Sequence, residues 1–183
     1  MRTERAGQSA LLFLDVAELL TRENVDYLII GAFALSVHGL VRASSDVDAL
    51  LHVSYARLAR ISKIFEAAGF EVTIRRGDDE DPILNMLVLS DSYGNRVELL
   101  GGLRGLDPLS FSRAVEVPFY GVNLRVAGRE DFIAMKCFAG SPQDLADARD
   151  AFEGAQGPVD VDLLRAVTRR FGRAAADRLE EIL

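Results

Sequence analysis

The residues of this chain with the clearest chemical potential lie between Leu28 and Asp48. A hydrophobic strand pattern runs into Gly31, a short helical segment follows, and a second strand opens with Asp46 and Asp48, one residue apart. Side chains alternate across a strand, so both carboxylates are expected on one face. Neighbouring carboxylates repel unless a cation or a proton joins them, and Mg²⁺ is the usual solution. A glycine turn before a helix can present N–H groups to a phosphate. The segment therefore predicts nucleotide chemistry, with phosphoryl or nucleotidyl transfer as the reaction.

The composition predicts a globular domain with an ordinary core. The chain has 183 residues, of which 49% are hydrophobic and 27% charged, enough for one domain with a small appendage. No apolar run approaches transmembrane length, and Asp15 and Glu18 interrupt the apolar N-terminal stretch, so we expect neither a membrane span nor a signal peptide. The only cysteine, Cys137, cannot form an internal disulfide, which fits the cytoplasm. A net charge of −7 argues against a broad nucleic-acid surface but leaves room for a local basic patch.

The order of hydrophobic patterns predicts an α/β (α+β) fold in which helices flank a mixed sheet. We expect a mixed α/β core over residues 1–128 and a helical region over 129–183 that packs on the sheet and completes a cleft. The core should begin with an amphipathic helix over 9–22 and contain a hairpin about Tyr120-Gly121. Ser54 is expected to cap a helix that ends near Gly69.

The segment from Gly31 to Asp48 resembles the signature of the DNA polymerase β-like nucleotidyltransferase superfamily, a glycine turn followed by acid-x-acid. Within it, the pattern is similar to minimal bacterial nucleotidyltransferases of the abortive-infection toxin type. A second block, Asp131 to Lys136 followed by Asp144 and Asp147, is similar to a helical element of the same group. The two blocks anchor residues 25–150. The resemblance implies a nucleoside triphosphate substrate, Mg²⁺ or Mn²⁺ as cofactor, an RNA or protein acceptor, and a cognate antitoxin.

Two residues depart from that pattern. Relatives carry Gly or Ser where this chain has Ala32, which supplies only its backbone N–H to a phosphate. A basic residue often precedes the acid at position 144, where this chain has Gln143. Both changes favour an alternative in which the protein is a non-catalytic nucleotide-binding or regulatory module.

The remaining candidate residues have both a functional and a structural interpretation. Glu98 is the candidate third carboxylate, acting on the metal or as a base, or else it is an exposed strand glutamate. The candidate nucleotide contacts, beyond Gly31 and Ala32, are Arg42, Ser45, Lys136 and Asp144. Arg42 could instead pair with an aspartate, and Ser45 could shape the strand entrance. Lys136, in an apolar helical stretch, needs an anionic partner, which is either a triphosphate or Asp144 or Glu98, and Asp144 could equally be a helix cap.

The leading hypothesis is thus a metal-dependent nucleotidyltransferase, with Asp46, Asp48 and Glu98 as catalytic residues and metal ligands. The resemblance makes it the toxin of a toxin–antitoxin pair. A third possibility is a nucleotidyltransferase that modifies a small molecule such as an antibiotic.

Overall fold

The computed structural model describes residues 1–38, 44–78, 80–154 and 157–183. Arg42, a candidate nucleotide contact, lies outside the described residues. The core contains the helices α1 (Ser9–Arg22), α2 (Gly31–Val37) and α3 (Tyr55–Ala67) and the 3₁₀ helix η1 (Pro108–Phe111). Its strands are β1 (Tyr27–Ile30), β2 (Asp46–Leu51), β3 (Glu71–Arg76), β4 (Asn85–Ser90), β5 (Arg96–Leu100), β6 (Val115–Phe119) and β7 (Val122–Val126). The C-terminal helices are α4 (Arg129–Ala139), α5 (Pro142–Glu153), α6 (Val161–Arg169) and α7 (Arg173–Glu180).

The seven strands form one mixed sheet in the order β3-β4-β5-β2-β1-β7-β6. The central strand β2 carries Asp46 and Asp48. It runs parallel to its neighbour β5 and antiparallel to its other neighbour, β1. The β6–β7 hairpin extends the sheet through the parallel pairing of β1 with β7. The predicted hairpin about Tyr120-Gly121 is therefore confirmed, and so is the predicted fold class.

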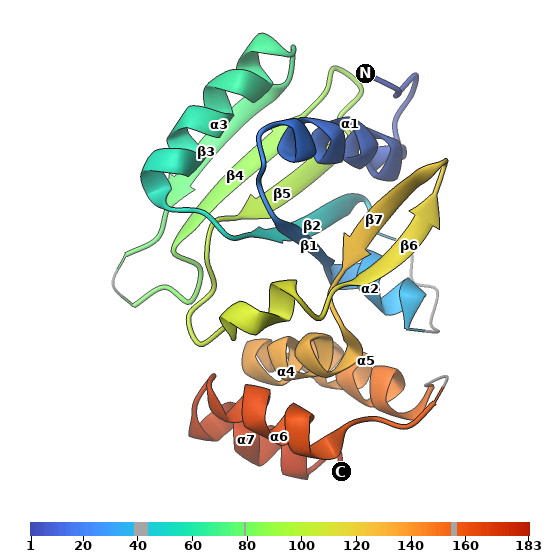
Figure 1. The fold of residues 1–183 in the computed structure, drawn as a ribbon, viewed down its shortest axis with the longest axis vertical. Coiled ribbons are helices and arrows are strands. Elements are labelled where there is room, and N and C mark those ends of the chain that lie inside the picture. Colours follow the sequence, from blue (N-terminus) through green and yellow to red (C-terminus); the bar gives the residue numbers. More distant parts are fainter. Residues whose placement is uncertain (39–43, 79, 155–156) are drawn as a thin grey trace.

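Helices cover the sheet on one side, and a helical layer lies at one end (Figure 1). The helix α1 packs on β2 and β5, and α3 packs on β3 and β4. The amphipathic pattern of α1 explains this placement, since Leu12, Phe13, Val16 and Leu20 are buried. Ser54 caps α3 as predicted, because its Oγ accepts a hydrogen bond from the backbone N–H of Arg57.

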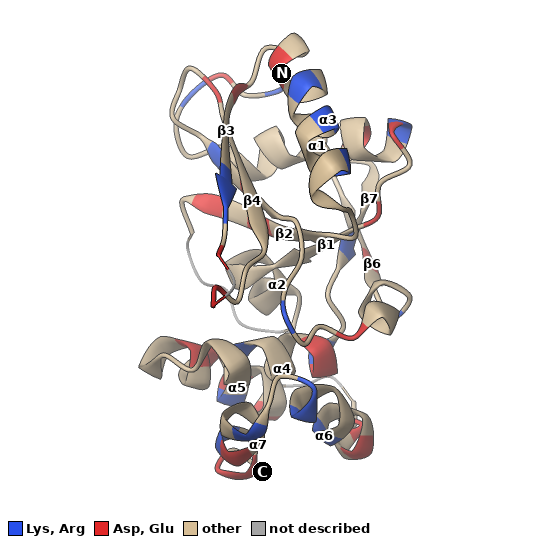
Figure 2. Cartoon of the chain, turned by 90° about the vertical axis from the view of Figure 1, so that its left-hand side faces the viewer, with Lys and Arg blue, Asp and Glu red and all other residues tan. Residues whose placement is uncertain are grey.

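The helices α4 to α7 form a layer below the sheet, with α4 and α5 in its upper part and α6 and α7 farther from the sheet (Figure 2). Buried residues of α4, α6 and α7 belong to the same continuous hydrophobic cluster as those of the sheet. A cluster that spans both parts agrees with the prediction that the helical region packs on the sheet.

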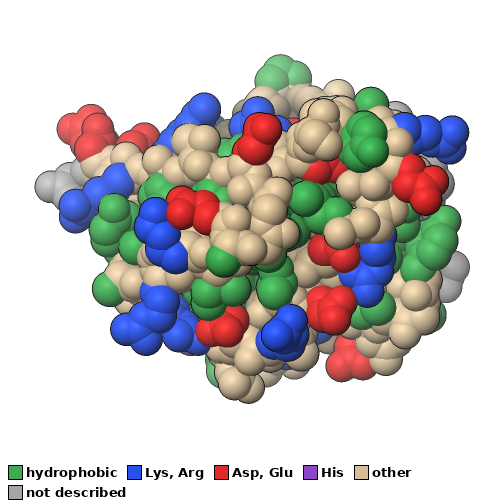
Figure 3. Space-filling model, turned by 90° about the horizontal axis from the view of Figure 1, so that it is seen from above, with side chains coloured by type: hydrophobic (Ala, Val, Ile, Leu, Met, Phe, Trp, Pro, Cys, Tyr) green, Lys and Arg blue, Asp and Glu red, His purple; other side chains and the backbone are tan. Residues whose placement is uncertain are grey.

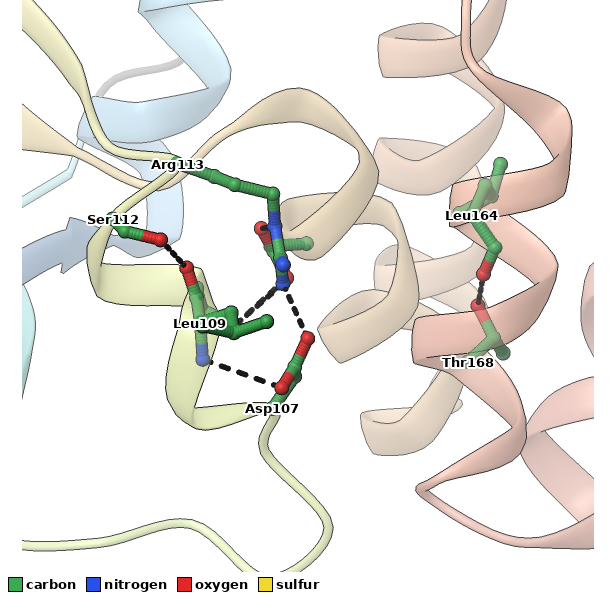
Figure 4. Close-up of polar contacts among 8 residues, drawn as sticks. Asp107, Leu109, Ser112, Arg113, Leu164 and Thr168 are labelled. Carbon is green, nitrogen blue, oxygen red and sulfur yellow. Dashed lines mark hydrogen bonds and ion pairs between the residues drawn. The ribbon is translucent and has the colours of Figure 1, made fainter.

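A partly buried ion-pair network attaches α4 to the chain segment that precedes β6. The guanidinium of Arg113 lies 2.6 Å from Asp131 in the first turn of α4 and 2.9 Å from Asp107, which caps η1 (Figure 4). Ser110 donates a further hydrogen bond to Asp131. The sequence patterns did not predict η1 or this network. The ion pairs of this network hold α4, which carries Lys136, in a fixed position against the core.

In the described part of the chain, none of the helices is both long and apolar enough to cross a membrane.

Candidate functional site

The sheet register places the three candidate acidic residues next to one another. Asp48 pairs with Glu98 across the parallel β2–β5 ladder, and with Ile30 across the β1–β2 ladder. Asp46 precedes Asp48 by two residues and pairs with Arg96. Since side chains two residues apart in a strand share a face, Asp46, Asp48, Arg96 and Glu98 occupy one face of the sheet. The intervening residues of β2 and β5 are buried on the opposite face.

Gly31 gives the polypeptide room to turn directly against Asp48. It has a φ of +67°, and a Cβ built on it would lie 3.3 Å from Asp48 Cγ and closer still to Asp48 Oδ2. The backbone of α2 therefore begins in van der Waals contact with the carboxylate that the metal-site hypothesis requires. Only glycine combines this positive φ with the absence of a side chain.

We expect Gly31→Ala to impair both folding and binding of a metal–nucleotide complex. The positive φ alone should lower the free energy of unfolding by ~1–2 kcal/mol, and the new Cβ must displace the Asp48 carboxylate. Gly121→Ala is the matched control, because Gly121 has a φ of +80° with no other atoms near the Cβ position. Both variants should lose stability in urea unfolding, but only Gly31→Ala should lose affinity for Mn²⁺ with a non-hydrolysable nucleotide. Equal affinities of the two folded variants would remove Gly31 from the site.

The environment of Asp48 disfavours its ionised form. Burial raises the pKa of Asp48 to about 6, and the negative charges of Asp46 and Glu98 act in the same direction. Lys136 and Arg96 oppose the increase. A partly buried carboxylate beside two others is a site that a cation would stabilise.

This pKa predicts that Asp48→Asn stabilises the protein at high pH in the absence of divalent ions. Below the ordinary pKa of 3.8 the Asp48 carboxyl is protonated in both the folded and the unfolded states, so it adds no charge penalty. As the pH rises through about 6, the Asp48 carboxyl of the folded protein ionises in an environment that disfavours its charge, and the free energy of unfolding falls. We therefore expect Asp48→Asn to raise the free energy of unfolding by ~2–3 kcal/mol at pH 8. Urea unfolding in EDTA at pH 8 and at pH 5 measures this, and a gain that does not shrink at pH 5 would contradict the assigned cause.

Glu98 does not face the aspartates as a free carboxylate. Its Oε1 forms an ion pair with Nη2 of Arg96, two residues earlier on the same strand. Within the described residues, no three His, Cys, Asp or Glu side chains converge closely enough to hold a metal ion. The donor chemistry fits Mg²⁺ or Mn²⁺, since Asp46 and Asp48 supply hard oxygen ligands, but the third ligand is engaged elsewhere.

A cleft of about 260 Å³ opens beside Asp48, between the sheet and α4. Gly31, Asp48, Lys136 and Asp144 line it. Most of its remaining lining is apolar: Ile30, Pro82, Ile83, Leu100, Leu103, Phe132, Met135, Phe138 and Ala139. The tertiary fold thus joins two predicted sequence blocks that are about a hundred residues apart.

Lys136 lies at the centre of a partly buried charge network. Its Nζ is 2.8 Å from Asp144 Oδ1 and 2.8 Å from Asp147 Oδ2. The side chain of Lys136 is 14% exposed and that of Asp147 is 2% exposed. Gln143 donates a hydrogen bond of 2.9 Å to Asp147 Oδ1, so this departure from the family pattern has a structural role. Asp144 also forms a capping box with Ser141. It therefore has both structural roles considered for it, as a partner of Lys136 and as a helix cap.

The hydrogen bonds of this network keep Asp144 ionised. Burial acts to raise the pKa of Asp144, but hydrogen bonds from Lys136 and Ser141 outweigh it and lower the pKa below its usual value. Lysine has three N–H donors. Two of those on Lys136 are directed at the carboxylates of Asp144 and Asp147. We expect the third to be available to an acceptor in the cleft.

The other predicted residues have less direct connections to the cleft. Ala32 is buried in the first turn of α2, beside Gly31. Ser45 is exposed, and its backbone carbonyl accepts a hydrogen bond from Ser9. Asp46 accepts a hydrogen bond of 2.8 Å from Ser44 and lines a separate hollow of about 150 Å³. The paired aspartates therefore lie between a hollow with several hydroxyl groups and the apolar cleft.

A larger hollow of about 300 Å³ lies away from these carboxylates, beside His38, Arg113 and Arg129. Arg113 is committed to Asp107 and Asp131 there. None of the predicted site residues lines this hollow, so the candidate functional site remains at Asp46 and Asp48 although the hollow is larger than the cleft.

Comparison with known proteins rests on structure, because no protein-family model and no curated protein matches the sequence. ANT(2'')-Ia, solved with adenylyl-2''-tobramycin, has a TM-score of 0.62 and 14% identity, over 88% of this chain and 95% of that one. The chain has the nucleotidyltransferase fold. A nucleotidyltransferase-like protein of Paracoccidioides brasiliensis has a TM-score of 0.53 and 16% identity, over 98% of this chain and 91% of that one. The lincosamide antibiotic adenylyltransferase LnuA, solved with lincomycin, has a TM-score of 0.53 and 11% identity, over 82% and 99% of the two chains.

The predicted superfamily resemblance is therefore supported at the level of the fold. The closer resemblance to abortive-infection toxins stays a prediction.

Sequence reasoning missed two residues of the site. Arg96 was available from the period-two rule, which places it on the face of Glu98. Asp147 was noted only as part of the second sequence block, and nothing in the sequence indicated that it pairs with Lys136.

Proposed function

We propose that this protein is a metal-dependent nucleotidyltransferase that transfers a nucleotide from a nucleoside triphosphate to a hydroxyl acceptor. The observation that carries the proposal is the contact of the Gly31 turn with Asp48, with Asp46 and Glu98 on the same sheet face. The fold similarity to nucleotidyltransferases supports it.

Asp46 and Asp48 would hold Mg²⁺ or Mn²⁺, which supplies charge neutralisation at the phosphates and lowers the pKa of an attacking hydroxyl. The turn at Gly31 lets a phosphate approach the backbone, and Ala32 contributes its N–H. Lys136 directs its remaining N–H donor at a phosphate oxygen, while Asp144 and Asp147 fix its position. Arg42 and Ser45 remain proposed nucleotide contacts.

In the reaction, the acceptor oxygen forms a bond to the α-phosphorus while the bond from that phosphorus to the bridging oxygen breaks, which releases pyrophosphate. Glu98 would be the third ligand of the ion and would take the hydroxyl proton once its carboxylate is free of Arg96. The protein contributes position and charge complementarity to an in-line displacement.

The sequence resemblance leads us to propose RNA or protein as the acceptor. It also leads us to propose that the protein is a toxin with a cognate antitoxin. A small hydroxyl-bearing molecule is the second candidate, and two observations favour it. ANT(2'')-Ia and LnuA, whose structures contain adenylyl-2''-tobramycin and lincomycin, align over nearly their whole length. The chain carries a net charge of −7, and the face of the molecule seen from above in Figure 3 mixes acidic and basic side chains, so that face has no broad basic patch for RNA.

Incubation with each labelled nucleoside triphosphate and Mg²⁺ tests the proposal. The acceptors supplied should be total cell RNA, total cell protein, an aminoglycoside and a lincosamide. We expect label in one acceptor class, loss of transfer in EDTA, and no transfer by Asp48→Asn. Transfer that persists in Asp48→Asn would contradict the assigned site, and absence of label in every class would favour the non-catalytic binding module.

A further inference from the structure

Arg96 contacts the carboxylate of Glu98, which the proposed reaction requires to be free. It precedes Glu98 by two residues on β5, and the parallel register places it opposite Asp46. Its Nη2 forms the ion pair with Glu98 Oε1. The side chain of Glu98 is 19% exposed and that of Arg96 is 42% exposed, so the pair lies at the open edge of the site.

The ion pair explains why the carboxylates do not converge. The backbone brings Asp48 and Glu98 into direct register, which is close enough for both to contact one ion. Even so, the described residues contain no group of three acidic or other ligating side chains in position to hold a metal. The guanidinium of Arg96 occupies the Glu98 oxygen that a metal ion would otherwise use.

The arrangement leaves one polar group of Arg96 without a hydrogen bond. The Nε of Arg96 is buried and has no hydrogen-bond partner among the described residues. An unsatisfied buried donor disfavours the conformation that leaves it so. Because much of the Arg96 side chain is already exposed, water can solvate its guanidinium when Glu98 leaves it.

We propose that Arg96 is a positioning residue that holds Glu98 away from the metal site and releases it when the metal–nucleotide complex arrives. The inference rests on the proposed function, since it assumes that Asp46 and Asp48 bind a metal. Its consequence is that the nucleotide-free protein binds a divalent ion through two carboxylates and the loaded protein through three. Arg96 therefore couples full metal ligation to the presence of nucleotide.

Mn²⁺ titration of the nucleotide-free protein, followed by electron paramagnetic resonance, tests the proposal. Arg96→Met keeps much of the stem volume and removes the competing cation. We expect its Mn²⁺ affinity to exceed that of the wild type by about two- to fivefold, the range that corresponds to loss of one partly exposed ion pair. Arg75→Met is the matched control, because Arg75 is an exposed arginine on the edge strand of the same sheet and its loss changes net charge equally.

Two further variants separate competition for Glu98 from a general charge effect. Arg96→Met combined with Glu98→Gln should lose the gain, because the released carboxylate is no longer a ligand. Arg96→Lys should stay near the wild type, since it keeps a cation beside Glu98. Circular dichroism confirms that each variant is folded before the titration.

The proposal is overturned if folded Arg96→Met binds Mn²⁺ no more tightly than Arg75→Met, or if the gain survives Glu98→Gln. A parallel titration with Mn²⁺ and a non-hydrolysable ATP analogue tests the proposed metal–nucleotide site separately from the role of Arg96. If the wild type binds that complex and Asp48→Asn does not, the metal site stands, and an absent gain in Arg96→Met rejects only the role of Arg96. If neither protein binds it, both proposals fail.

Discussion

Asp46→Asn and Asp48→Asn should each lower the affinity for a magnesium–nucleotide complex by ~100-fold or more, because each removes a charged oxygen ligand from the ion. The effect should be larger for Asp48, which lies against Gly31 and lines the cleft beside α4. Isothermal titration with a non-hydrolysable nucleotide measures both affinities.

The fold should survive these substitutions. Asn is nearly isosteric with Asp, and removal of charge at Asp48 is expected to stabilise the protein at neutral and higher pH. Asp177→Asn is the control for charge alone, since the side chain of Asp177 is 69% exposed on α7, outside the sheet that carries the carboxylates. Affinities of the two site variants that match the control would contradict a metal site on β2.

Lys136→Met should have the largest effect on stability, a loss of ~3–5 kcal/mol at neutral pH. The substitution leaves Asp147 almost fully buried and Asp144 partly buried, both without the ammonium that lies 2.8 Å from each. The hydrogen bonds that Gln143 donates to Asp147 and Ser141 donates to Asp144 do not replace the charge of the ammonium. Urea unfolding provides the measurement.

Lys63→Met is the matched control for this prediction, because the Lys63–Glu66 pair lies on the surface and Lys63 is 74% exposed. It should cost less than ~1 kcal/mol. Lys136→Met combined with Asp147→Asn should recover part of the loss, because the buried charge disappears with its partner. A loss for Lys136→Met no larger than that for Lys63→Met would show that the network contributes little.

The same variant separates the two roles considered for Lys136. The network agrees with the structural role, and the place of Lys136 in the cleft beside Asp48 allows the nucleotide role as well. If its third N–H donor binds a phosphate, nucleotide affinity per folded molecule should also fall in Lys136→Met. If that affinity is unchanged, Lys136 is a purely structural residue.

The sequence predicts those features of the site that depend only on the alternation of side chains along one strand or on the residues at one helix end. Two residues separated by one in a strand share a face whatever the tertiary fold, so the shared face of Asp46 and Asp48 could be predicted. Helix caps are equally local, and Ser54 was identified from the residues around it alone.

The remaining features depend on strand order and on contacts between distant segments. The pairing of Asp48 with Glu98 requires β2 and β5 to be parallel neighbours, although two strands come between them in sequence. The contact of Asp131 with Arg113 depends on a 3₁₀ turn in a segment without a strong hydrophobic period. The carboxylate partners of Lys136 were only partly predictable, because burial of Asp147 is a property of helix packing.

The most direct test of the central claim is a crystal structure with Mn²⁺ and a non-hydrolysable nucleoside triphosphate, in which anomalous scattering locates the ion. Our account predicts an anomalous peak between the carboxylates of Asp46 and Asp48, at roughly 2.0–2.3 Å from their oxygens. It also predicts the triphosphate beside Gly31, and Glu98 released from Arg96 to the ion. A well-ordered nucleotide and ion bound elsewhere, with no peak at Asp46 and Asp48, would contradict it.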